Sequence, residues 1–537
     1  MTQYSALSAQ LASVLQESSQ MKTINEKRQH NLRLPISRIP NEILSTIFCD
    51  LRSNFKIYPR QHGLKRLKVW VTITFVCHAW REVALNTSLL WCHIDVSSPF
   101  HRWMPELLRR SQESLLTIYI DWVVNFERGF LEEVKKHFGR TRELALDGLY
   151  IAIMYEIFSS ESQTNFQNLE VLDIFHPYAT TSRTSFLLND SYLRAERLRS
   201  LRLCSCAIDW NSKFLQGLTH LRLVGIPNGC RLGPYAFTLV LSKIPALKTL
   251  HLSDFFLENE VQTHRATKIH LQYLQRLHME SQVPEMAQFL SSLVVPRSCK
   301  LSLRRSWSKD DAICDNFRVI LSWISNHFRV PTTPSDRDPS DHEQCIRSFR
   351  LDFDVGTGME DFKIEGFSDV LSLEQLNTAD PILEFIVDWS YEDGNIDINS
   401  RTFLSLLPLS CVTFLDVYNS VELSDEFWMV AFGSIKTLKT VYLGITGPHF
   451  WQFLMTPVTG DNGTTIKSLP FPALASVTVE EHYPDLQLIL DTLRVRSELG
   501  GTQLQDLCFS SRSVGVSAPM IQLGELVSHV EYDESER

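Results

Sequence analysis

The sequence lacks long apolar runs and the common signatures of catalysis. No apolar run approaches about 18 residues, so we expect no membrane-spanning helix. There is no Gly-x-Ser-x-Gly elbow, no Gly-x4-Gly-Lys-Ser/Thr phosphate loop and no His-Glu-x-x-His zinc motif. The 17 His do not cluster at metal-ligand spacing. We therefore expect a non-enzyme without cofactor or metal; a hydrolase or transferase with an unrecognised site is the alternative.

Cysteine is present but follows no framework. The 11 Cys are odd in number and scattered, without any Cys-x-x-Cys pair. Cys204 and Cys206 form an isolated Cys-x-Cys with no matching ligands nearby. The start, Met-Thr-Gln-Tyr-Ser, lacks the basic and apolar regions of a signal peptide. These features predict a reducing compartment, the cytoplasm, the nucleus or both.

The charge is distributed unevenly along the chain. Residues 1–110 contain 15 Lys and Arg against 7 Asp and Glu, a net of +8, which leaves 37 against 55, a net of −18, for the remainder. An acidic main body argues against a nucleic-acid binder. A chain of 537 residues exceeds one compact core, so we expect a modular or repetitive protein.

Two apolar helical patterns stand near the N-terminus. Pro40 suits a first helical turn, and two stripes at helical spacing follow it in the chain. A module of about sixty residues buries only part of this surface, so the rest is expected to bind a partner. The alternative is two ordinary helices of a larger core. The stripes comprise Ile43, Leu44, Ile47, Phe48 and Leu51, then Ile73, Val76, Cys77, Trp80, Val83 and Ala84, with Leu89, Leu90 and Trp91 after a break.

The order of these residues resembles a known family. A Leu-Pro start, Ile-Pro-x-Glu-Ile-Leu-x-x-Ile-Phe, Val-Cys-x-x-Trp-Arg and a later Leu-Trp are similar to the F-box-like, leucine-rich-repeat proteins expanded in mushroom-forming basidiomycete fungi. The resemblance covers residues 32–95 and implies docking onto an acidic Skp-family adaptor. The residues it assigns to adaptor binding are Leu34, Pro35, Ile39, Pro40, Ile43, Leu44, Ile47, Val76, Cys77, Trp80 and Trp91.

Two segments beside this module depart from a compact pattern. Residues 52–70 are a longer link than the family's and strongly basic, with Arg52 at their start. Residues 1–31 carry an amphipathic helix with a broken heptad. We expect that helix to pack on the module; self-association is the alternative.

A short unit recurs after residue 110: aliphatic, any residue, aliphatic. Most spacings between successive units fall near the leucine-rich-repeat range of about 20–29 residues. The best unit is Leu198-x-x-Leu201-x-Leu203-x-x-Cys206. We expect residues 110–512 to form an α/β structure, a degenerate leucine-rich-repeat horseshoe after an all-α F-box, with the middle residue of each unit facing away from the core. An α/β domain with unrelated strands is the alternative.

One gap of 50 residues interrupts the repeats between Leu301 and Leu351. We expect an inserted helix over 310–329 and a mobile loop within 304–348, and a second loop over 459–465. Residues 513–537 are expected to be a C-terminal tail whose end frays.

The middle residues of neighbouring repeats predict a basic ladder for a protein target. Stacked repeats would align these side chains on one face, where they could hold an acidic or phosphorylated segment. A solvated strand face is the alternative. The ladder comprises Arg202, Arg222, His251 and His278, with Arg304 just beyond Leu303; later repeats have Asp352, Asp416 and Tyr442 at this position, so the basic ladder does not run the whole length.

The resemblance implies a function without chemistry in this chain. It is that of the substrate-recognition subunit of an SCF-type ubiquitin ligase, which binds the adaptor, and through it a cullin scaffold, at the F-box and a protein target at the repeats. Catalysis would be proximity supplied to a partner enzyme for ubiquitin-dependent degradation. The alternative is a protein-interaction scaffold outside any ligase.

Overall fold

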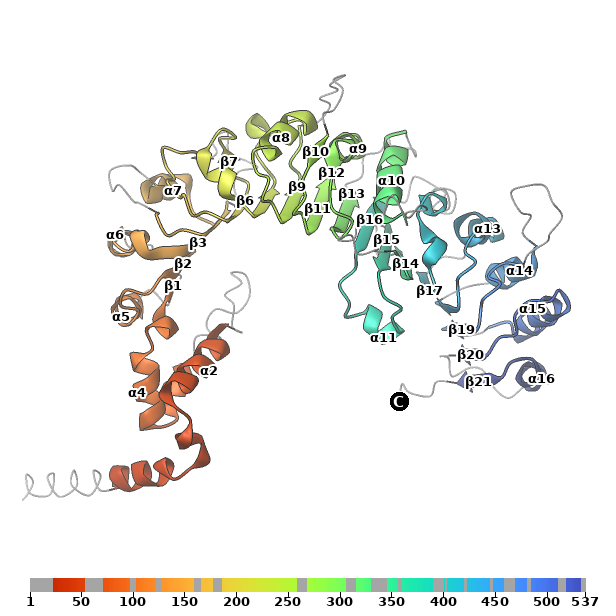
Figure 1. The fold of residues 1–537 in the computed structure, drawn as a ribbon, viewed down its shortest axis with the longest axis horizontal. Helices are drawn as coiled ribbons and strands as arrows, with labels where there is room; N and C mark the ends of the chain where they lie inside the picture. Colours follow the sequence, from red (N-terminus) through yellow and green to blue (C-terminus); the bar gives the residue numbers. More distant parts are fainter. Residues whose placement is uncertain are drawn as a thin grey trace, which may run out of the picture. The chain divides into compact units, whose positions relative to one another are not determined.

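The computed structural model is a mixed α/β structure with many β-strands, most of which pair in parallel (Figure 1). It divides into two compact units, residues 1–214 and 215–537. The structure describes residues 23–53, 71–96, 103–121, 128–158, 166–176, 186–257, 268–305, 315–329, 345–355, 360–389, 400, 403–419, 423–444, 448–457, 469–480, 484–509 and 518–532.

The first unit begins with a helical module. Its α2 and α4 are joined through Phe48 and Trp80, whose ring centroids lie 5.2 Å apart. The Trp91 indole N–H donates to the Ala84 carbonyl at 2.8 Å, which ties the end of the module to α4. Residues 23–32 are helical with Ile24 exposed; the rest of the predicted N-terminal helix lies outside the described residues. The elements are η1 (Pro35–Arg38), α2 (Asn41–Ser53), η2 (Thr72–Phe75), α4 (His78–Asn86) and η3 (Ser88–Trp91).

Five parallel strands complete the first unit, in the order β1, β2, β3, β4 and β6. Helices α5, α6 and α7 lie on one side of β1, β2 and β3 (Figure 1). The elements are β1 (His93–Asp95), α5 (Met104–Arg110), β2 (Leu116–Asp121), α6 (Arg128–Lys135), η5 (Phe138–Arg140), β3 (Thr141–Asp147), α7 (Ile151–Phe158), β4 (Val171–Phe175) and β6 (Ser200–Cys204), with a small sheet of β5 (Leu187–Leu188) and β7 (Ala207–Ile208).

The second unit continues the strand-and-helix alternation. Its elements are β8 (His220–Val224), η8 (Asn228–Cys230), α8 (Pro234–Leu241), β9 (Thr249–Ser253), β11 (Arg276–Ser281), α9 (Val283–Ser291), β13 (Lys300–Arg305), α10 (Asp315–Phe328), β14 (Ser348–Val355), β15 (Glu360–Phe367), α11 (Leu373–Leu376), β16 (Leu383–Trp389), η11 (Leu409–Cys411), β17 (Phe414–Asn419), α13 (Asp425–Phe432), β18 (Thr440–Leu443), α14 (His449–Met455), β19 (Ser476–Val479), α15 (Leu486–Glu498), β20 (Asp506–Phe509), α16 (Ala518–Leu526) and β21 (His529–Tyr532). The short β10 (Ile269–His270) and β12 (Leu293–Val294) pair separately, and η7 (Lys213–Gly217) spans the unit boundary.

The predicted alternation is confirmed in β8, although in β2 the middle residue Tyr119 is itself buried. In β8, Leu221 and Leu223 are buried and Arg222 between them is exposed. The strand side chains alternate because successive Cβ atoms point to opposite faces of a sheet. Helices α8, α9 and α10 cover the leucine side, so the intervening residues form the opposite face (Figure 1).

The same backbone junction recurs where the strands begin. One carbonyl accepts the N–H groups of two consecutive residues at the start of the next strand, which holds each turn of the chain at the same offset from its neighbour. The accepting carbonyls, each followed by its two donors, are Thr219 with Lys248 and Thr249, Lys248 with Gln275 and Arg276, Thr413 with Lys439 and Thr440, and Lys439 with Ala475 and Ser476.

Strand order departs from chain order between β13 and β17. β13 pairs in parallel with β16, β16 antiparallel with β15, β15 antiparallel with β14, and β14 in parallel with β17. The expectation that the repeats stack in chain order is therefore wrong for this stretch. The inserted helix is present as α10, and the predicted loops over 331–343 and 459–465 lie outside the described residues.

The C-terminal segment is more ordered than a tail. Helix α16 and strand β21 fall within the predicted tail, and β21 pairs in parallel with β20. Leu523 and Val527 are buried, so the last repeat is closed by an apolar core as the earlier ones are.

We predict that Leu223→Ala lowers the free energy of unfolding by about 2–5 kcal/mol, because it removes a fully buried side chain and leaves a cavity. Urea denaturation followed by circular dichroism measures the change. Arg222→Ala, one residue away on the exposed face, is the matched control and is expected to stay within about 0.5 kcal/mol of wild type. Equal losses in both variants would contradict the assignment of the two faces.

Candidate interaction surfaces

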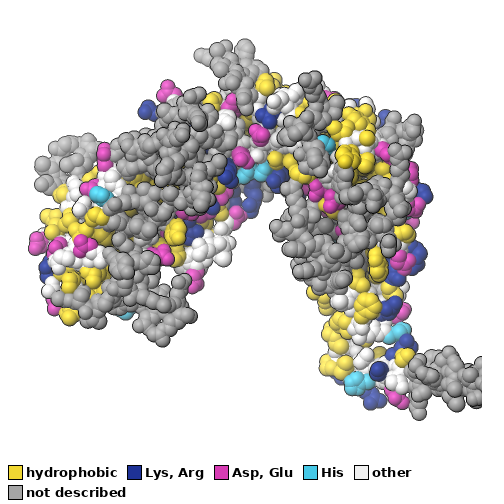
Figure 2. Space-filling view, turned by 180° about the vertical axis from the view of Figure 1, so that it is seen from behind, with side chains coloured by type: hydrophobic (Ala, Val, Ile, Leu, Met, Phe, Trp, Pro, Cys, Tyr) yellow, Lys and Arg dark blue, Asp and Glu magenta, His cyan; other side chains and the backbone are white. Residues whose placement is uncertain are grey.

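An exposed apolar surface covers one side of the helical module. Ile43 and Ile47 on α2 are 52% and 40% exposed, and Phe75 and Val76 before α4 are 73% and 58% exposed. Figure 2 shows hydrophobic side chains gathered on this module at the lower right of the view. Exposed apolar surface of this kind, grouped on one small module, is a candidate site of protein association.

The exposure follows from the width of the apolar stripe on α2. Ile43, Ile47 and Leu51 recur every four residues and form one edge of the helix, all exposed. Leu44 and Phe48 form the adjacent edge and are buried. The helix therefore has more apolar surface than the module can cover.

The predicted adaptor-binding residues are exposed, half-buried or buried. Leu34, Pro35, Pro40, Ile43, Ile47 and Val76 are exposed, and Ile39, Cys77 and Trp80 are half-buried. Leu44 and Trp91 are buried in the module's own core, so they support the surface instead of forming it. Phe75 and Leu89 are also exposed on the module, although they were not among the predicted adaptor-binding residues.

Arg52 is a structural residue. It was assigned to the basic link 52–70, but it lies at the end of α2, buried, and donates to the Leu90 carbonyl. Burial lowers the pKa of its guanidinium to about 10. The rest of the link, residues 54–70, lies outside the described residues.

A second surface is the strand face of the second unit. Register places one side chain per strand in a continuous row across this face. The row begins with Arg222, His251 and His278, and its first part is basic or neutral. It runs Arg222, His251, His278, Ser302, Glu384, Glu365, Arg350, Asp416, Tyr442, Thr478, Cys508 and Glu531.

Two histidines stack within the row. The rings of His251 and His278 are 3.9 Å apart between centroids and 9° from parallel. Burial, with smaller contributions from His278 and Arg222, lowers the pKa of His251 to about 3. The pKa of His278 is also lowered by burial, although Glu280 and Glu384 oppose the shift. Both rings are therefore neutral at pH 7.

A chain of hydrogen bonds links the histidines to the acidic part of the row. The Ser302 hydroxyl donates to Glu384 Oε2 at 2.6 Å, and Ser302 Oγ lies 2.9 Å from His278 Nδ1. Because the Ser302 proton is used on Glu384, the oxygen is left to accept from Nδ1–H. This fixes the tautomer of His278 as the one protonated at Nδ1.

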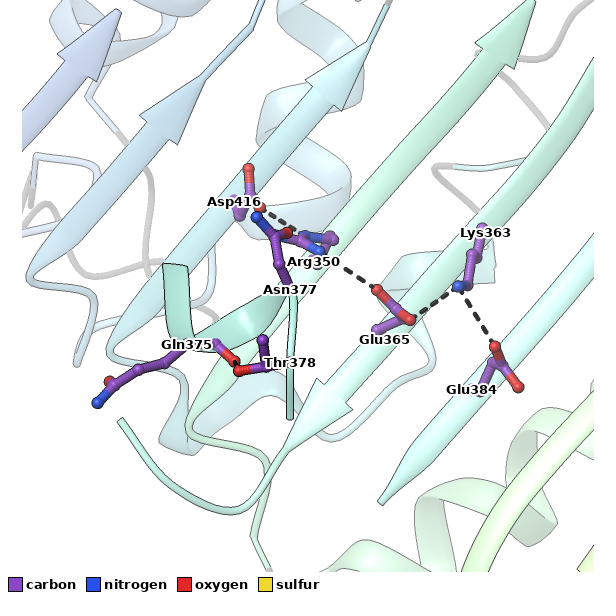
Figure 3. Close-up of polar contacts among 8 residues, drawn as sticks. All are labelled: Arg350, Lys363, Glu365, Gln375, Asn377, Thr378, Glu384 and Asp416. Atoms are coloured by element: carbon purple, nitrogen blue, oxygen red, sulfur yellow. Dashed lines mark hydrogen bonds and ion pairs between the residues drawn. The ribbon is translucent and has the colours of Figure 1, made fainter. Parts of the chain in front are cut away.

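Beyond Ser302 the charges neutralise one another (Figure 3). Lys363 Nζ lies 2.8 Å from Glu365 and 3.3 Å from Glu384. Arg350 Nε donates to Asp416 Oδ2 at 2.6 Å, and the same guanidinium reaches Asn377 Oδ1 at 2.9 Å. Figure 3 shows these side chains pointing toward one another from neighbouring strands, so this stretch is an internal ionic network.

Asp416 is the buried centre of that network. Burial raises the pKa of its carboxyl, and the hydrogen bond from Arg350 opposes the rise. Asp416 is 1% exposed, so its charge depends on Arg350 more than on water.

The predicted basic ladder is only partly assembled. Arg222, His251 and His278 are neighbours in one row. Arg202 belongs to the first unit, where its guanidinium lies 3.7 Å from Asp173. Arg304 is wrongly placed in the ladder, because it lies two residues further along its strand and is in register with Glu280.

The register also corrects the second half of the predicted row. Asp352 was expected beside Asp416, but it is in register with Lys363 and Tyr418, and Arg350 takes the place beside Asp416. Ser302, Glu384 and Glu365 were not predicted, although Ser302 is the middle residue of the Leu301/Leu303 unit.

The described residues contain no group of three or more His, Cys, Asp and Glu side chains that could hold a metal ion. In the same part of the chain, no helix combines the length and the apolar character needed to cross a bilayer. In comparisons with known proteins, no family model matches this sequence, and no curated protein shows significant similarity to it.

We predict that acid destabilises the second unit through His251. The folded protein holds this ring neutral, whereas the unfolded chain takes up a proton below about pH 6.5. Stability from this residue is full above pH 6.5 and is lost as pH falls towards 3. Urea unfolding at pH 7 and pH 5 should show His251→Gln losing about 1–2 kcal/mol less than wild type.

The matched control is His270→Gln, since His270 is exposed on β10. This variant should lose as much stability as wild type between the two pH values. A pH response of His251→Gln identical to that of wild type would refute the assignment.

We further predict that Asp416→Ala costs about 3 kcal/mol of unfolding free energy, because half-buried Arg350 loses its nearest carboxylate and keeps only Glu365 at 3.7 Å. Asp491→Ala is the control: Asp491 is an exposed partner of Arg494, and a surface pair contributes about 0–1 kcal/mol. Urea denaturation compares the two, and a loss for Asp416→Ala as small as that of the control would contradict the prediction.

Proposed function

We propose that the helical module is an F-box and that this chain is the substrate-recognition subunit of an SCF-type ubiquitin ligase. The F-box would bind a Skp-family adaptor, and the strand-and-helix repeats would present a protein target in the cytoplasm or nucleus. The observation that carries the proposal is the exposed edge of α2, Ile43, Ile47 and Leu51, beside a packed edge of the same helix.

The exposed residues can supply adaptor affinity. Full burial of an aliphatic or aromatic side chain contributes roughly 1.5–3 kcal/mol. Ile43, Ile47, Phe75 and Val76 therefore retain several kcal/mol that only a partner can realise. The net charge of +8 over residues 1–110 would favour encounter with an acidic adaptor.

The proposed architecture for the remainder is a degenerate leucine-rich-repeat solenoid. Its support is the recurring junction at the strand starts, the buried leucine pairs and the parallel pairing of neighbouring strands. Left-handed residues directly follow several strands, at Gly148, Ser205, Gly225 and Asp254, which gives successive units the same exit geometry.

The target would meet the strand face. Within the row, Arg222 is exposed and next to the neutral histidine pair, while Arg350 is engaged by Asp416. Lys363, beside the row on β15, is engaged by Glu365. Arg222, His251 and His278 are therefore the residues we assign to target binding. A scaffold outside any ligase would use the same face, and adaptor binding separates the two functions.

We predict that the tagged chain captures a recombinant Skp-family adaptor and that Ile43→Asp/Ile47→Asp abolishes capture. Both substitutions put a charge on the exposed edge of α2, so the module's core is left intact. Pull-down followed by isothermal titration calorimetry measures binding. Val319→Asp, on the exposed part of α10, is the matched control and should bind as wild type.

Circular dichroism checks that each variant is folded. No adaptor bound by the folded wild-type chain would refute the ligase function and leave the scaffold. Equal binding by wild type and the α2 variant would refute the assigned surface.

A further inference from the structure

Two cysteines lie side by side ahead of two paired strands. Cys345 stands three residues before β14 and Cys411 three residues before β17. These strands are parallel, with Ser348 opposite Phe414. When this pairing register is extended three residues toward the N-terminus of both strands, Cys345 lies opposite Cys411.

The backbone remains paired up to this point. The Arg347 carbonyl accepts the N–H groups of Thr413 and Phe414, at 2.8 and 3.2 Å. Neighbouring strands lie about 4.8 Å apart. A disulfide spans Cα atoms about 4.4–6.8 Å apart, so the two backbones have a suitable separation.

Both cysteines face the same way. Ile346 and Val412, one residue further on, are fully buried in the core. Cys345 and Cys411 are half-buried free thiols on the opposite side, and their side chains are in hydrogen-bonding contact. The pair is therefore open to a small reagent.

The surroundings distinguish the two sulfurs. The Arg347 guanidinium hydrogen-bonds Cys345, and this contact raises the pKa of Arg347. Burial raises the pKa of the Cys411 thiol, and Cys345 raises it further. Because the thiolate is the attacking species and Cys345 is the sulfur that a guanidinium contacts, we assign the first attack to Cys345.

We propose that Cys345 and Cys411 form a redox-active dithiol that oxidised glutathione converts into an intramolecular disulfide. The Cys345 thiolate attacks one sulfur of the oxidant, which releases one glutathione thiolate and leaves a mixed disulfide on Cys345. The Cys411 thiolate then attacks the Cys345 sulfur, forms the intramolecular bond and releases the second glutathione. Two protein thiols lose two electrons and two protons, and the two released glutathione thiolates carry the electrons and take up the protons to become thiols.

The disulfide would act on the strand face. It joins the chain before β14 to the chain before β17, five residues from Arg350 and Asp416 respectively. Oxidation therefore fixes the junction between the strands inserted after β13 and the repeats that follow. This inference is independent of the proposed function.

The test treats the folded chain with oxidised glutathione, alkylates the remaining thiols and digests with trypsin. The expected product is a disulfide between peptides 338–347 and 402–436, each of which contains one cysteine. Cys345→Ser should lose this product. Cys508→Ser, at another half-buried cysteine, should retain it.

A second measurement uses phenylarsine oxide, which binds two adjacent thiols together. Wild type should take up one equivalent more than Cys411→Ser, whose folding circular dichroism verifies. A linked peptide absent from the oxidised wild type, or equal arsenical uptake by the two chains, would overturn the proposal.

Discussion

The structure depends on burial of alternating apolar side chains of its strands, such as Leu221 and Leu223 of β8, beneath the flanking helices. A strand or a helix with one apolar face cannot cover that face alone, so each strand-and-helix unit depends on its neighbours. In β8 this constraint fixes Leu221 and Leu223 on the inner side and sends Arg222 to the other. Because parallel register aligns the strands, the outward residues must form rows. The stacked histidines and the Arg350–Asp416 pair lie in such a row, because the apolar side chains that alternate with them occupy the core.

Sequence periodicity predicts the strands well and their order poorly. The aliphatic-x-aliphatic units coincide with β8, β9, β11 and β13, because alternating burial is a local property. Strand β15 was not predicted, although Phe362 and Ile364 are buried in it. Its direction depends on pairing with β14 and β16, and no local pattern encodes the partner of a strand.

The candidate sites show the same division. An apolar stripe identified α2 and its module, but Ile43 and Leu44 are consecutive apolar residues and only tertiary packing decides that the first is exposed and the second buried. Likewise, the sequence predicted that Arg222, His251 and His278 would align, since their strands are neighbours in both chain and sheet. It misplaced Arg304 and Asp352 by two residues, because the register of a strand depends on its partner.

The reversed strand order has a consequence for how this protein reaches its fold. A stack built in chain order can grow from any turn, each new turn adding to the last. Strand β16 lies against β13, yet the chain makes β14 and β15 first, and β17 must return to β14. The antiparallel pairs β14–β15 and β15–β16 join strands that follow one another in the chain, so they can form early. The pairs β13–β16 and β14–β17 close longer loops, so the docking of this three-stranded unit between β13 and β17 should be the slower step.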